Sequence, residues 1–478
     1  MKQRMLVVSN RLPIVVGEQE GQWTINPGSG GLVTALAPIM SANHGVWVGW
    51  PGCDQSAPLD RLCRQFADEH GYSLAPLPLS EGEVEAYYRG FSNETLWPLF
   101  HDLLGNCHFE LDHFKVYQSV NRKFAELTAS TCSADDFVWV HDYQLMLVAH
   151  YLRQLGVDQS LAFFLHIPFP SADLFRRLPW KDQLLAGLLE FDLIGFQTLR
   201  DHRNFVHSAT SLAADTRVIS RHRHYTLLRQ GERTIKVGHF PISIDFNQFA
   251  SQAASEQVAD AAWYLHENYQ LRQIMLGIDR LDYTKGIPER FLAFERALEK
   301  YPEMRGKISL LQVVVPSRTL VPDYLDLKTL LEQLAGRING RFSLHGWVPV
   351  HYHYRSLDPV QLLAHYRTAE IALVTPLRDG MNLVAKEYCA SSVESRGVLI
   401  LSEFAGAAEQ LGRQALLVNP YDLEKTADAM YAAFTMPVEE QQQRMARLRN
   451  DIRRHDVHRW VLSFMAAADR RGEHDIEP

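Results

Sequence analysis

Arg280 and Lys285 are the residues of this 478-residue chain whose types and spacing point most directly to chemistry. The two cations lie five residues apart where a strand-like run ends and the chain must turn. Arginine offers a planar fork of N–H donors and lysine a compact charge, so the pair can neutralise a leaving diphosphate. The neighbouring Asp279 and Asp282 leave a second interpretation open. Two cations and two carboxylates can also satisfy one another as a surface ion-pair cluster.

A second segment, residues 375–387, follows the strand-like run 371–374 and opens a helix. Asp379 precedes Gly380, so the first free N–H groups of that helix would face a ligand at its N-terminus. Glu387 lies one turn beyond Leu383 on the same face, where its carboxylate could accept both hydroxyls of a ribose. The alternatives are that Asp379 is a plain N-cap and Glu387 a surface residue.

Polar residues and glycines follow several expected strands in the first half. The loop Gly28-Ser29-Gly30-Gly31 precedes an expected helix, and its N–H groups with the helix dipole could receive a phosphate, although a simple turn explains it equally well. Asn10-Arg11, His141-Asp142 and His166 each end a strand-like run. Parallel strands present their carboxyl ends at one edge, so we expect these side chains there. A lone arginine or histidine in such a place is more often solvated or structurally satisfied.

Aromatic residues could complete a sugar site. Tyr87, Tyr88 and Trp97 carry amphipathic rings that suit sugar faces and hydroxyls, with core packing as the default interpretation. The sequence has no HExxH, no Asp-x-Asp and no GxSxG motif, so nothing in it calls for a divalent metal or a serine nucleophile.

The elements that must position these residues alternate between short apolar runs and longer amphipathic stretches. That order predicts an α/β fold with parallel sheets covered by helices. The expected strands are 5–9, 137–140, 161–166 and 193–197 in the first half, and 274–278, 308–315, 371–374, 398–402 and 415–418 in the second.

A seam at residues 237–245 divides the chain, because a strand-like run there meets Pro241 and then an Ala- and Gln-rich helical stretch. We expect a Rossmann-like domain over 1–240, a second one over 241–455, and a C-terminal helix and tail over 456–478 that pack back on the first domain. Two doubly wound halves place the default active site in the cleft between their carboxyl strand ends.

The amino-acid composition excludes some classes of binding partner. Lys and Arg total 48 against 56 Asp and Glu, a net charge of −8, so no global basic field exists to hold nucleic acid or a membrane surface. The five cysteines show no CxxC pair or regular spacing. With no signal-like segment at the start, we expect reduced thiols and a cytoplasmic protein.

Taken together, these residues resemble the trehalose-6-phosphate synthase family, retaining glucosyltransferases of glycosyltransferase family 20. The similarity runs from Val8 to about Asn450. Its most specific stretches are 93–101, 138–143, 166–170, 280–288, 336–340, 377–388 and 404–408. The resemblance implies a GT-B fold of two Rossmann-like domains and transfer of glucose from UDP-glucose to glucose 6-phosphate, giving α,α-trehalose 6-phosphate and UDP. It implies no cofactor and no metal.

The resemblance also implies roles for individual residues. The donor diphosphate would lie on Arg280 and Lys285. Asp379 would hold the transferred glucose, and Glu387 the ribose. Further donor contacts would come from Gly31, Gly380, Met381, Asn382 and Leu383.

On the acceptor side, the resemblance implies contacts from Arg11, Tyr88, Trp97 and Arg318, with the two arginines and Tyr88 on the 6-phosphate. Asp142 and His166 would orient the sugars beside the reacting centre, so the implied catalytic set is Asp142, His166, Arg280, Lys285 and Asp379. The chain departs from the family pattern at Gln144, Asp279 and Gly238-His239.

Two other functions fit the same residues. One is a glucosylglycerol-phosphate synthase, which uses ADP-glucose and glycerol 3-phosphate. The other is a catalytically silent subunit that senses sugar phosphate. The expected partners are the two small substrates, a second copy of the chain, and a separate trehalose-6-phosphate phosphatase that acts on the product.

Overall fold

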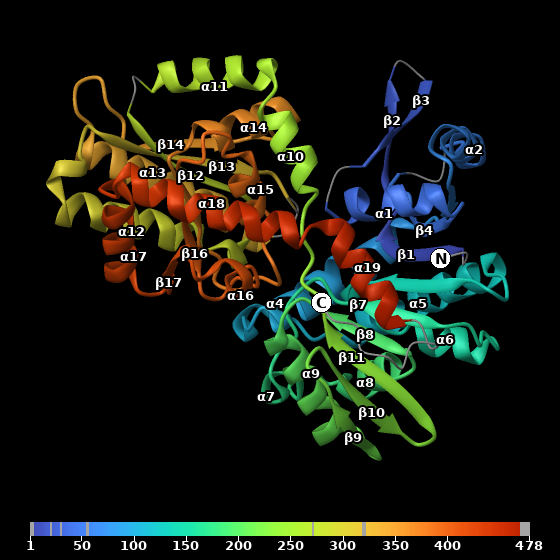
Figure 1. Cartoon of the computed structure of the whole chain (residues 1–478). Helices are drawn as coiled ribbons and strands as arrows, with labels where there is room; N and C mark the ends of the chain where they lie inside the picture. The colour runs from blue at the N-terminus through green and yellow to red at the C-terminus, as the bar shows by residue number, and fades with distance from the viewer. Residues whose placement is uncertain are drawn as a thin grey trace. The chain divides into compact units, whose positions relative to one another are not determined.

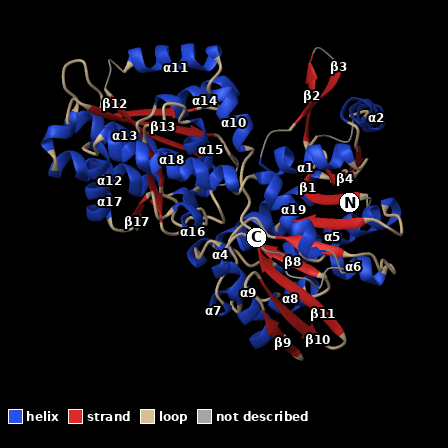
Figure 2. Ribbon diagram, viewed as in Figure 1, coloured by secondary structure: helices blue, strands red, loops and turns tan. Residues whose placement is uncertain are grey.

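Two parallel sheets, each covered by helices, form the framework of the chain (Figures 1 and 2). The computed structural model describes residues 4–19, 22–28, 31–53, 57–269, 272–317 and 322–468. The chain divides into one unit that contains residues up to Pro241 together with the segment from Trp460, and a second unit, Ile242–Arg459.

The sheet of the first unit has the order β5-β4-β1-β6-β7-β8-β11-β10-β9 within the described residues. Its strands from β5 to β11 pair in parallel, and β10 and β9 add an antiparallel edge. A separate hairpin joins β2 to β3. The strands are β1 (Met5–Arg11), β2 (Ile14–Gln19), β3 (Gln22–Pro27), β4 (Val46–Trp50), β5 (Ser73–Pro76), β6 (Phe137–His141), β7 (Leu161–Phe164), β8 (Leu193–Phe196), β9 (Thr216–Arg221), β10 (Tyr225–Gln230) and β11 (Arg233–His239).

Helices connect and cover these strands. They are α1 (Gly31–Ala42), α2 (Leu59–His70), α3 (Glu81–Glu83), α4 (Trp97–Phe100), α5 (Leu111–Thr131), α6 (Val148–Gln154), α7 (Ala172–Phe175), α8 (Lys181–Leu188), α9 (Leu199–Leu212) and α19 (Val457–Ala468). A π-helix spans Val84–Leu96. Such wide helical turns are rare and concentrate at functional sites.

The C-terminal helix α19 packs on the sheet of the first unit. The ring of Phe464 stacks on Trp139 of β6, with centroids 4.3 Å apart and an interplanar angle of 6°. Trp460 donates its indole N–H to the carbonyl of Phe240 at 3.0 Å. A Cβ at Gly195 would lie 2.5 Å from the Phe464 ring, so this position must be glycine for the helix to approach β8.

The sheet of the second unit has the order β14-β13-β12-β15-β16-β17 and is parallel throughout its described strands. This is the doubly wound order: β12 to β14 are added towards one edge of the sheet, and β15 to β17 are added on the other side of β12, towards the opposite edge. The strands are β12 (Gln273–Arg280), β13 (Ile308–Val315), β14 (Val350–Tyr354), β15 (Ile371–Val374), β16 (Val398–Ser402) and β17 (Leu416–Val418). The helices are α10 (Phe246–Ala253), α11 (Glu256–Asn268), α12 (Ile287–Lys300), α13 (Pro322–Phe342), α14 (Pro359–Thr368), α15 (Leu383–Ser391), α16 (Ala408–Leu411), α17 (Leu423–Phe434) and α18 (Val438–Arg454).

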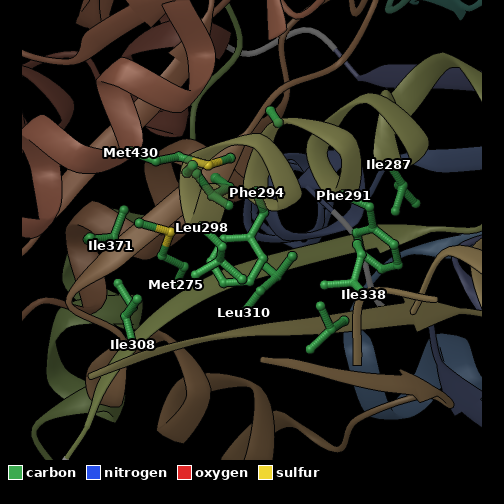
Figure 3. Packing of buried hydrophobic residues seen from close by; sticks show 14 of the residues in the cluster. Met275, Ile287, Phe291, Phe294, Leu298, Ile308, Leu310, Ile338, Ile371 and Met430 are labelled. Atoms are coloured by element: carbon green, nitrogen blue, oxygen red, sulfur yellow. The ribbon is translucent and has the colours of Figure 1, made fainter. Parts of the chain in front are cut away.

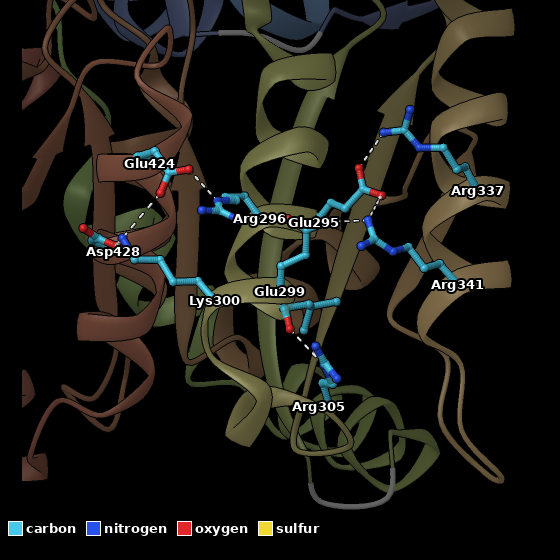
Figure 4. A network of polar contacts seen from close by, with 10 residues as sticks. Glu295, Arg296, Glu299, Lys300, Arg305, Arg337, Arg341, Glu424 and Asp428 are labelled. Carbon is cyan, nitrogen blue, oxygen red and sulfur yellow. Dashed lines mark hydrogen bonds and ion pairs between the residues drawn. The ribbon is translucent and has the colours of Figure 1, made fainter.

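Helix α12 seals the core of the second unit. Phe291, Phe294 and Leu298 are fully buried, and Figure 3 shows them among Met275, Leu310 and other apolar side chains of the neighbouring strands and helices. Each such side chain contributes about 1.5–3 kcal/mol to folding. The opposite face of α12 carries the ion pairs of Figure 4, including Arg296 with Glu424 at 2.5 Å. The side chains of Arg296 and Glu424 are 42% and 54% exposed, so this pair contributes only ~0–1 kcal/mol.

The expected central strands are present, with some differences at their ends. β7 ends at Phe164, two residues before His166, because the chain leaves the ladder ahead of the prolines at 168 and 170. β12 and β1 extend to Arg280 and Arg11, so both arginines are the last residues of their strands. Within the described ranges, none of the helices is both apolar enough and long enough to span a bilayer.

Candidate active site

The residues expected to bind the donor meet at the point where the strand order of the second unit reverses. Arg280 ends β12, and the short helical turn Tyr283–Lys285 follows it. The loop after β15 brings Asp379 to the same place, where Lys285 Nζ lies 2.5 Å from Asp379 Oδ2. The two side chains are only 11% and 13% exposed, so this ion pair lies in a largely dehydrated site. Asp379 Oδ2 also accepts a hydrogen bond from Asn382 Nδ2 at 3.2 Å.

Backbone hydrogen bonds hold this loop in place. Leu377 N donates to Thr284 O at 2.8 Å, which joins the loop to the turn that carries Lys285. Asp379 N donates to Phe404 O at 3.2 Å, and Ala407 N donates to Met381 O at 2.8 Å. The loop that carries Asp379 and Met381 is therefore bonded to two neighbouring segments, the turn with Lys285 and the segment after β16.

Helix α15 starts in this loop with an N-terminus that no side chain caps. Asn382 is its N-cap residue and adopts a left-handed conformation, φ 68°, without a side-chain cap bond. The N–H groups of the first turn, beginning at Leu383, can therefore bind an anion. Gly380 and Met381 are buried beside it.

Glu387 lies one turn further along α15. Tyr366 donates its hydroxyl to Glu387 Oε2 at 2.8 Å, which fixes the carboxylate. Burial raises the pKa of Glu387, and the tyrosine hydrogen bond opposes that shift. A carboxylate held in this way is suited to accept hydroxyl hydrogen bonds from a sugar ring.

Arg290 is the residue of this region that the sequence did not suggest. Its side chain is 0% exposed, and Nη1 lies 2.6 Å from Asp279 Oδ2 of β12 and 2.8 Å from Gln312 Oε1 of β13. Its Nε donates to Thr375 Oγ1, at the end of β15, at 3.0 Å. One guanidinium thus ties together β12, β13 and the residue that follows β15. A basic residue within an amphipathic helix ordinarily indicates the exposed face, so the sequence alone does not predict that Arg290 is buried and bonded to the strands.

Asp279 and Asp282 do not form the local ion-pair cluster with Arg280 and Lys285 that the sequence left open. Asp279 binds Arg290, and Asp282 accepts hydrogen bonds from the backbone N–H and hydroxyl of Thr284 at 3.0 and 2.8 Å. Arg280 lies at the exposed end of β12.

Gly286 gives a first prediction. Its φ is +63°, and a Cβ there would lie 2.3 Å from Thr375 O. We expect Gly286→Ala to cost about 1–2 kcal/mol in backbone strain and to push the two ligand-bearing loops apart, so that UDP binds more weakly. Gly340→Ala in α13 is the matched control, because a Cβ there meets no atom within 4 Å, and it should be neutral or stabilising. Calorimetry with UDP and urea unfolding measure both effects; equal UDP affinity in the two variants would contradict the prediction.

In the first unit, Asp142 follows the carboxyl end of β6 in a strained conformation. Its φ of 75° and ψ of 168° lie in a region that glycine almost alone adopts. Its Oδ1 accepts hydrogen bonds from the backbone N–H of Tyr143 at 3.1 Å and of His166 at 3.2 Å. The carboxylate thus joins the ends of β6 and β7, as expected for two residues at one sheet edge.

His166 lies beside Asp142 and is neutral at pH 7. Its Nε2 is 3.1 Å from His141 Nδ1, and the two rings stack with centroids 5.4 Å apart. Burial lowers the pKa of His166 to about 3. A neutral imidazole can give or accept a hydrogen bond to a sugar hydroxyl, but it holds no proton to donate as an acid.

The expected acceptor residues fall into two groups. The guanidinium carbon of Arg11 lies 4.5 Å from the centroid of the Trp50 ring. The ring of Tyr88 also contacts Trp50, with the two ring centroids 6.1 Å apart. Trp97 is 6% exposed and packs on His101 and Tyr143, with centroids 4.2 and 5.8 Å away.

Asn93 lies in one of the stretches that carry the family resemblance, but no role was predicted for it; it connects the two groups of expected acceptor residues. It donates to Tyr88 O at 2.6 Å and accepts from the Tyr143 hydroxyl at 2.9 Å. Gly31 is the first residue of α1. Arg318 lies outside the described residues.

In the second unit the structure places Lys285 against Asp379, with Glu387 on the helix that follows. In the first unit Asp142 accepts from the backbone of His166, and Arg11 and Tyr88 both contact Trp50. In the part of the chain that the structure describes, no group of three or more His, Cys, Asp or Glu side chains is arranged to hold a metal ion.

The model of one protein family, described as Glycosyltransferase family 20, matches residues 3–470. The chain belongs to glycosyltransferase family 20. A family member from Mycolicibacterium vanbaalenii, a trehalose-6-phosphate synthase, is 42% identical over 467 residues, which cover 97% of this chain and 95% of that protein. A bifunctional trehalose-6-phosphate synthase/phosphatase from Thermoproteus tenax is 41% identical over 474 residues; the match covers 97% of this chain but 63% of that longer protein.

Solved structures of family 20 proteins have the same fold. A UDP-forming α,α-trehalose-phosphate synthase from Burkholderia xenovorans, in complex with glucose 6-phosphate, superposes with a TM-score of 0.86 at 34% identity, over 97% of this chain and 99% of that one. An E. coli structure bound with UDP-2-fluoro glucose gives a TM-score of 0.87 at 37% identity, over 98% and 99% of the two chains. The fold is therefore GT-B, as the resemblance to the family implies.

Proposed function

We propose that this protein is a retaining glucosyltransferase that moves glucose from UDP-glucose to glucose 6-phosphate, giving α,α-trehalose 6-phosphate and UDP. The observation that carries the proposal is the buried Lys285–Asp379 pair beside the uncapped N-terminus of α15. In a family 20 chain, this arrangement supplies a cation for a diphosphate and a carboxylate for the hexose attached to it.

In the proposed reaction, the bond between glucose C1 and the diphosphate oxygen breaks as a hydroxyl of the acceptor bonds to C1 from the same face. The hydroxyl proton passes to the departing phosphate oxygen. Arg280, Lys285 and the N–H groups from Met381 to Leu383 stabilise the charge that develops on the diphosphate, and Asp379 holds the transferred glucose. Covalent attachment of the sugar to a carboxylate is not part of this scheme.

On the acceptor side, Arg11, Tyr88 and Arg318 would bind the 6-phosphate, and Trp97 would lie against the sugar. Asp142, with its carboxylate fixed between two strand ends, and the neutral His166 would orient the hydroxyl groups near C1. A binding site of this kind accelerates the reaction mainly through positioning.

A product assay tests the proposal. Glucose 6-phosphate and glycerol 3-phosphate are each offered with UDP-, ADP- and GDP-glucose, nucleotide release is followed, and the product is identified by NMR. We expect α,α-trehalose 6-phosphate and the release of UDP. Product from glycerol 3-phosphate alone would assign the chain to the glucosylglycerol-phosphate reaction. UDP binding without turnover on any pair would favour the sensing subunit.

Glu387 gives a prediction on donor affinity. Glu387→Gln keeps the shape of the side chain but removes the charge that would accept two ribose hydroxyls. We expect UDP to bind about 10- to 150-fold more weakly, because hydrogen bonds to a charged group contribute roughly 1.5–3 kcal/mol. Calorimetry with UDP and with its 2′-deoxy analogue is the measurement. The variant should lose the preference for the ribose form; a variant that retains the wild-type preference would show that Glu387 does not bind the ribose.

Four finer points are part of this proposal. We propose that turnover needs no metal, which assays with EDTA and with added Mg²⁺ would test. The five cysteines are free thiols in the structure, which is compatible with a cytoplasmic location. The sequence-based expectations of a homo-oligomer and of a separate phosphatase stay predictions. The Thermoproteus tenax relative, named as both synthase and phosphatase, is the counterexample to a separate phosphatase.

A further inference from the structure

A cluster of histidine and arginine side chains lies at the antiparallel edge of the first unit, outside the residues assigned to either substrate. Helix α9 packs beside β9 and β11 there (Figure 1). The members, which we call the His–Arg cluster, are His202 and Arg203 of α9, Arg221 at the end of β9, Arg223 and His224 in the turn before β10, and His239 at the end of β11.

The histidine rings of the cluster lie against one another. His202 and His239 have ring centroids 5.9 Å apart and nearly parallel planes, at 19°. His224 and His239 have centroids 6.0 Å apart. His202 is 5% exposed, and its Nε2 lies 3.0 Å from Thr226 Oγ1 of β10. Three separate segments therefore converge on one point.

Each ring retains an unused polar atom. Among the described residues, His202 Nδ1, His224 Nε2 and His239 Nδ1 are buried and have no hydrogen-bond partner. A buried polar group without a partner costs free energy, and three in contact are unusual in a native protein. These three atoms are available to hydrogen-bond a ligand that offers several polar atoms.

The charge of the cluster is uncompensated. Arg203, Arg221 and Arg223 are exposed, and within the described chain none of them forms an ion pair with a carboxylate. In the same unit, Arg153 pairs with Asp192 and Arg233 with Glu190. In a chain of net charge −8, with 56 acids for 48 bases, three unpaired neighbouring arginines form a local positive field.

Of the acidic residues on α9 and on the turns and ends of β9 to β11, Asp215 and Glu232 lie at the far end of the strands, and Asp201 is already bonded. Asp215 precedes β9, and Glu232 lies in the turn between β10 and β11. The cluster residues lie at the opposite end of these strands, at least six residues or about 20 Å away. Asp201 precedes His202, but its Oδ1 accepts from Phe169 N at 3.1 Å and its Oδ2 from Thr198 Oγ1 at 2.5 Å.

Two details favour a small oxyanion over other ligands. The positive charge of the three arginines opposes the binding of a metal cation. Burial, together with the neighbouring cations, lowers the pKa of both His202 and His239 to about 4. These two rings are therefore neutral at pH 7 and can donate and accept hydrogen bonds. The register of β9 also shifts opposite Leu227 and Leu228, an edge-strand bulge of the kind that redirects side chains next to ligand sites.

We propose that the His–Arg cluster is a second anion site that binds a phosphate-type oxyanion. Arg203, Arg221 and Arg223 form its rim and neutralise the charge, and the histidine rings form its floor and hydrogen-bond the oxygens. The site is separate from the proposed acceptor site, because β1, which carries Arg11, lies four strand spacings from β11, about 19 Å. The ligand is either free phosphate or the phosphate group of a small metabolite.

Calorimetry on the full chain tests this inference. UDP is kept at saturation to fill the donor site, and Arg11→Ala is present in every protein to weaken the proposed acceptor site. Inorganic phosphate is titrated into four proteins. The first carries Arg11→Ala alone and is the background; the others add Arg221→Ser/Arg223→Ser, Arg203→Ser or Arg217→Ser to it. Arg217 is the matched control, because it is an exposed arginine of β9 four residues from Arg221. Glycerol 3-phosphate replaces phosphate in a second arm.

We expect saturable phosphate binding in the background, at least about tenfold weaker in both cluster variants and within about twofold of the background in Arg217→Ser. Equal binding of glycerol 3-phosphate would identify a phosphate monoester as the ligand, and binding of phosphate alone would identify the free ion. The proposal is overturned if the background binds no phosphate at millimolar concentration, or if Arg217→Ser weakens binding as much as the cluster variants do. Because no turnover is measured, these results are independent of the proposed reaction.

Discussion

Lys285→Ala is expected to lower kcat by about 10²–10³-fold, because the proposed donor site would lose a cation that stabilises the leaving diphosphate. The side chain is 11% exposed and bonded to Asp379, so its charge acts in a low dielectric. Steady-state kinetics with UDP-glucose and glucose 6-phosphate measure the effect, and Arg280→Ala should lower kcat in the same direction.

Lys300→Ala is the control for this prediction. Lys300 forms an ion pair of similar length with Asp428, at 2.6 Å, but both side chains are more exposed, at 34% and 47%. Its removal should leave kcat unchanged and alter stability by about 0–1 kcal/mol. Kinetic constants of Lys285→Ala that match those of Lys300→Ala would remove Lys285 from the reaction.

Arg290→Met is expected to lower the free energy of unfolding by about 3–5 kcal/mol, since it leaves the buried carboxylate of Asp279 without its partner. Arg290 also bonds Gln312 and Thr375, so the donor site should loosen and KM for UDP-glucose should rise. Urea unfolding at pH 7, together with the KM of each substrate, measures both effects.

The loss should depend on pH in a defined direction. Burial raises the pKa of Asp279 even beside Arg290, and without the arginine that pKa rises further. A carboxyl group whose folded pKa is raised stabilises the protein below its unfolded pKa, and that contribution disappears as the pH rises through the folded value. The deficit of Arg290→Met should therefore be smaller at pH 5 than at pH 8.

Two further variants separate this mechanism from a loss of packing. Arg290→Met combined with Asp279→Leu removes both charges and should recover part of the stability. Arg296→Met, on the exposed side of the same helix, should cost less than about 1 kcal/mol. A double variant that is no more stable than Arg290→Met would show that the lost charge pairing is not the cause.

The central strands and their polar ends were predictable from the sequence. Strands such as β6 and β15 are buried on both faces, so they are continuous apolar runs, and the chemistry-bearing residues come directly after them. The edge strands β9 and β10 alternate exposed and buried residues and include arginines, and this pattern does not distinguish them from surface loops.

The pairing of distant residues was not predictable. Lys285 and Asp379 are 94 positions apart, and their contact depends on the loop bonds that the fold supplies. The burial of Arg290 likewise depends on Asp279 of β12, Gln312 of β13 and Thr375 directly after β15. The strained backbone of Asp142 leaves no trace in composition or periodicity, because an aspartate after a strand is compatible with many conformations.

Helix α19 has a consequence for how the protein is made. The ring of Phe464 covers Trp139 and fills the space that Gly195 leaves open, yet it lies more than 260 residues after both in the chain. When the ribosome has finished the first 241 residues, the part of their sheet around Trp139 and Gly195 still lacks the helix that packs on it, whereas the segment Ile242–Arg459 holds its unit in one continuous stretch of chain. The second half of the chain is thus able to reach its native state first, and the nascent first half must wait, with an aromatic surface open to chaperones or to aggregation, until the last helix is released.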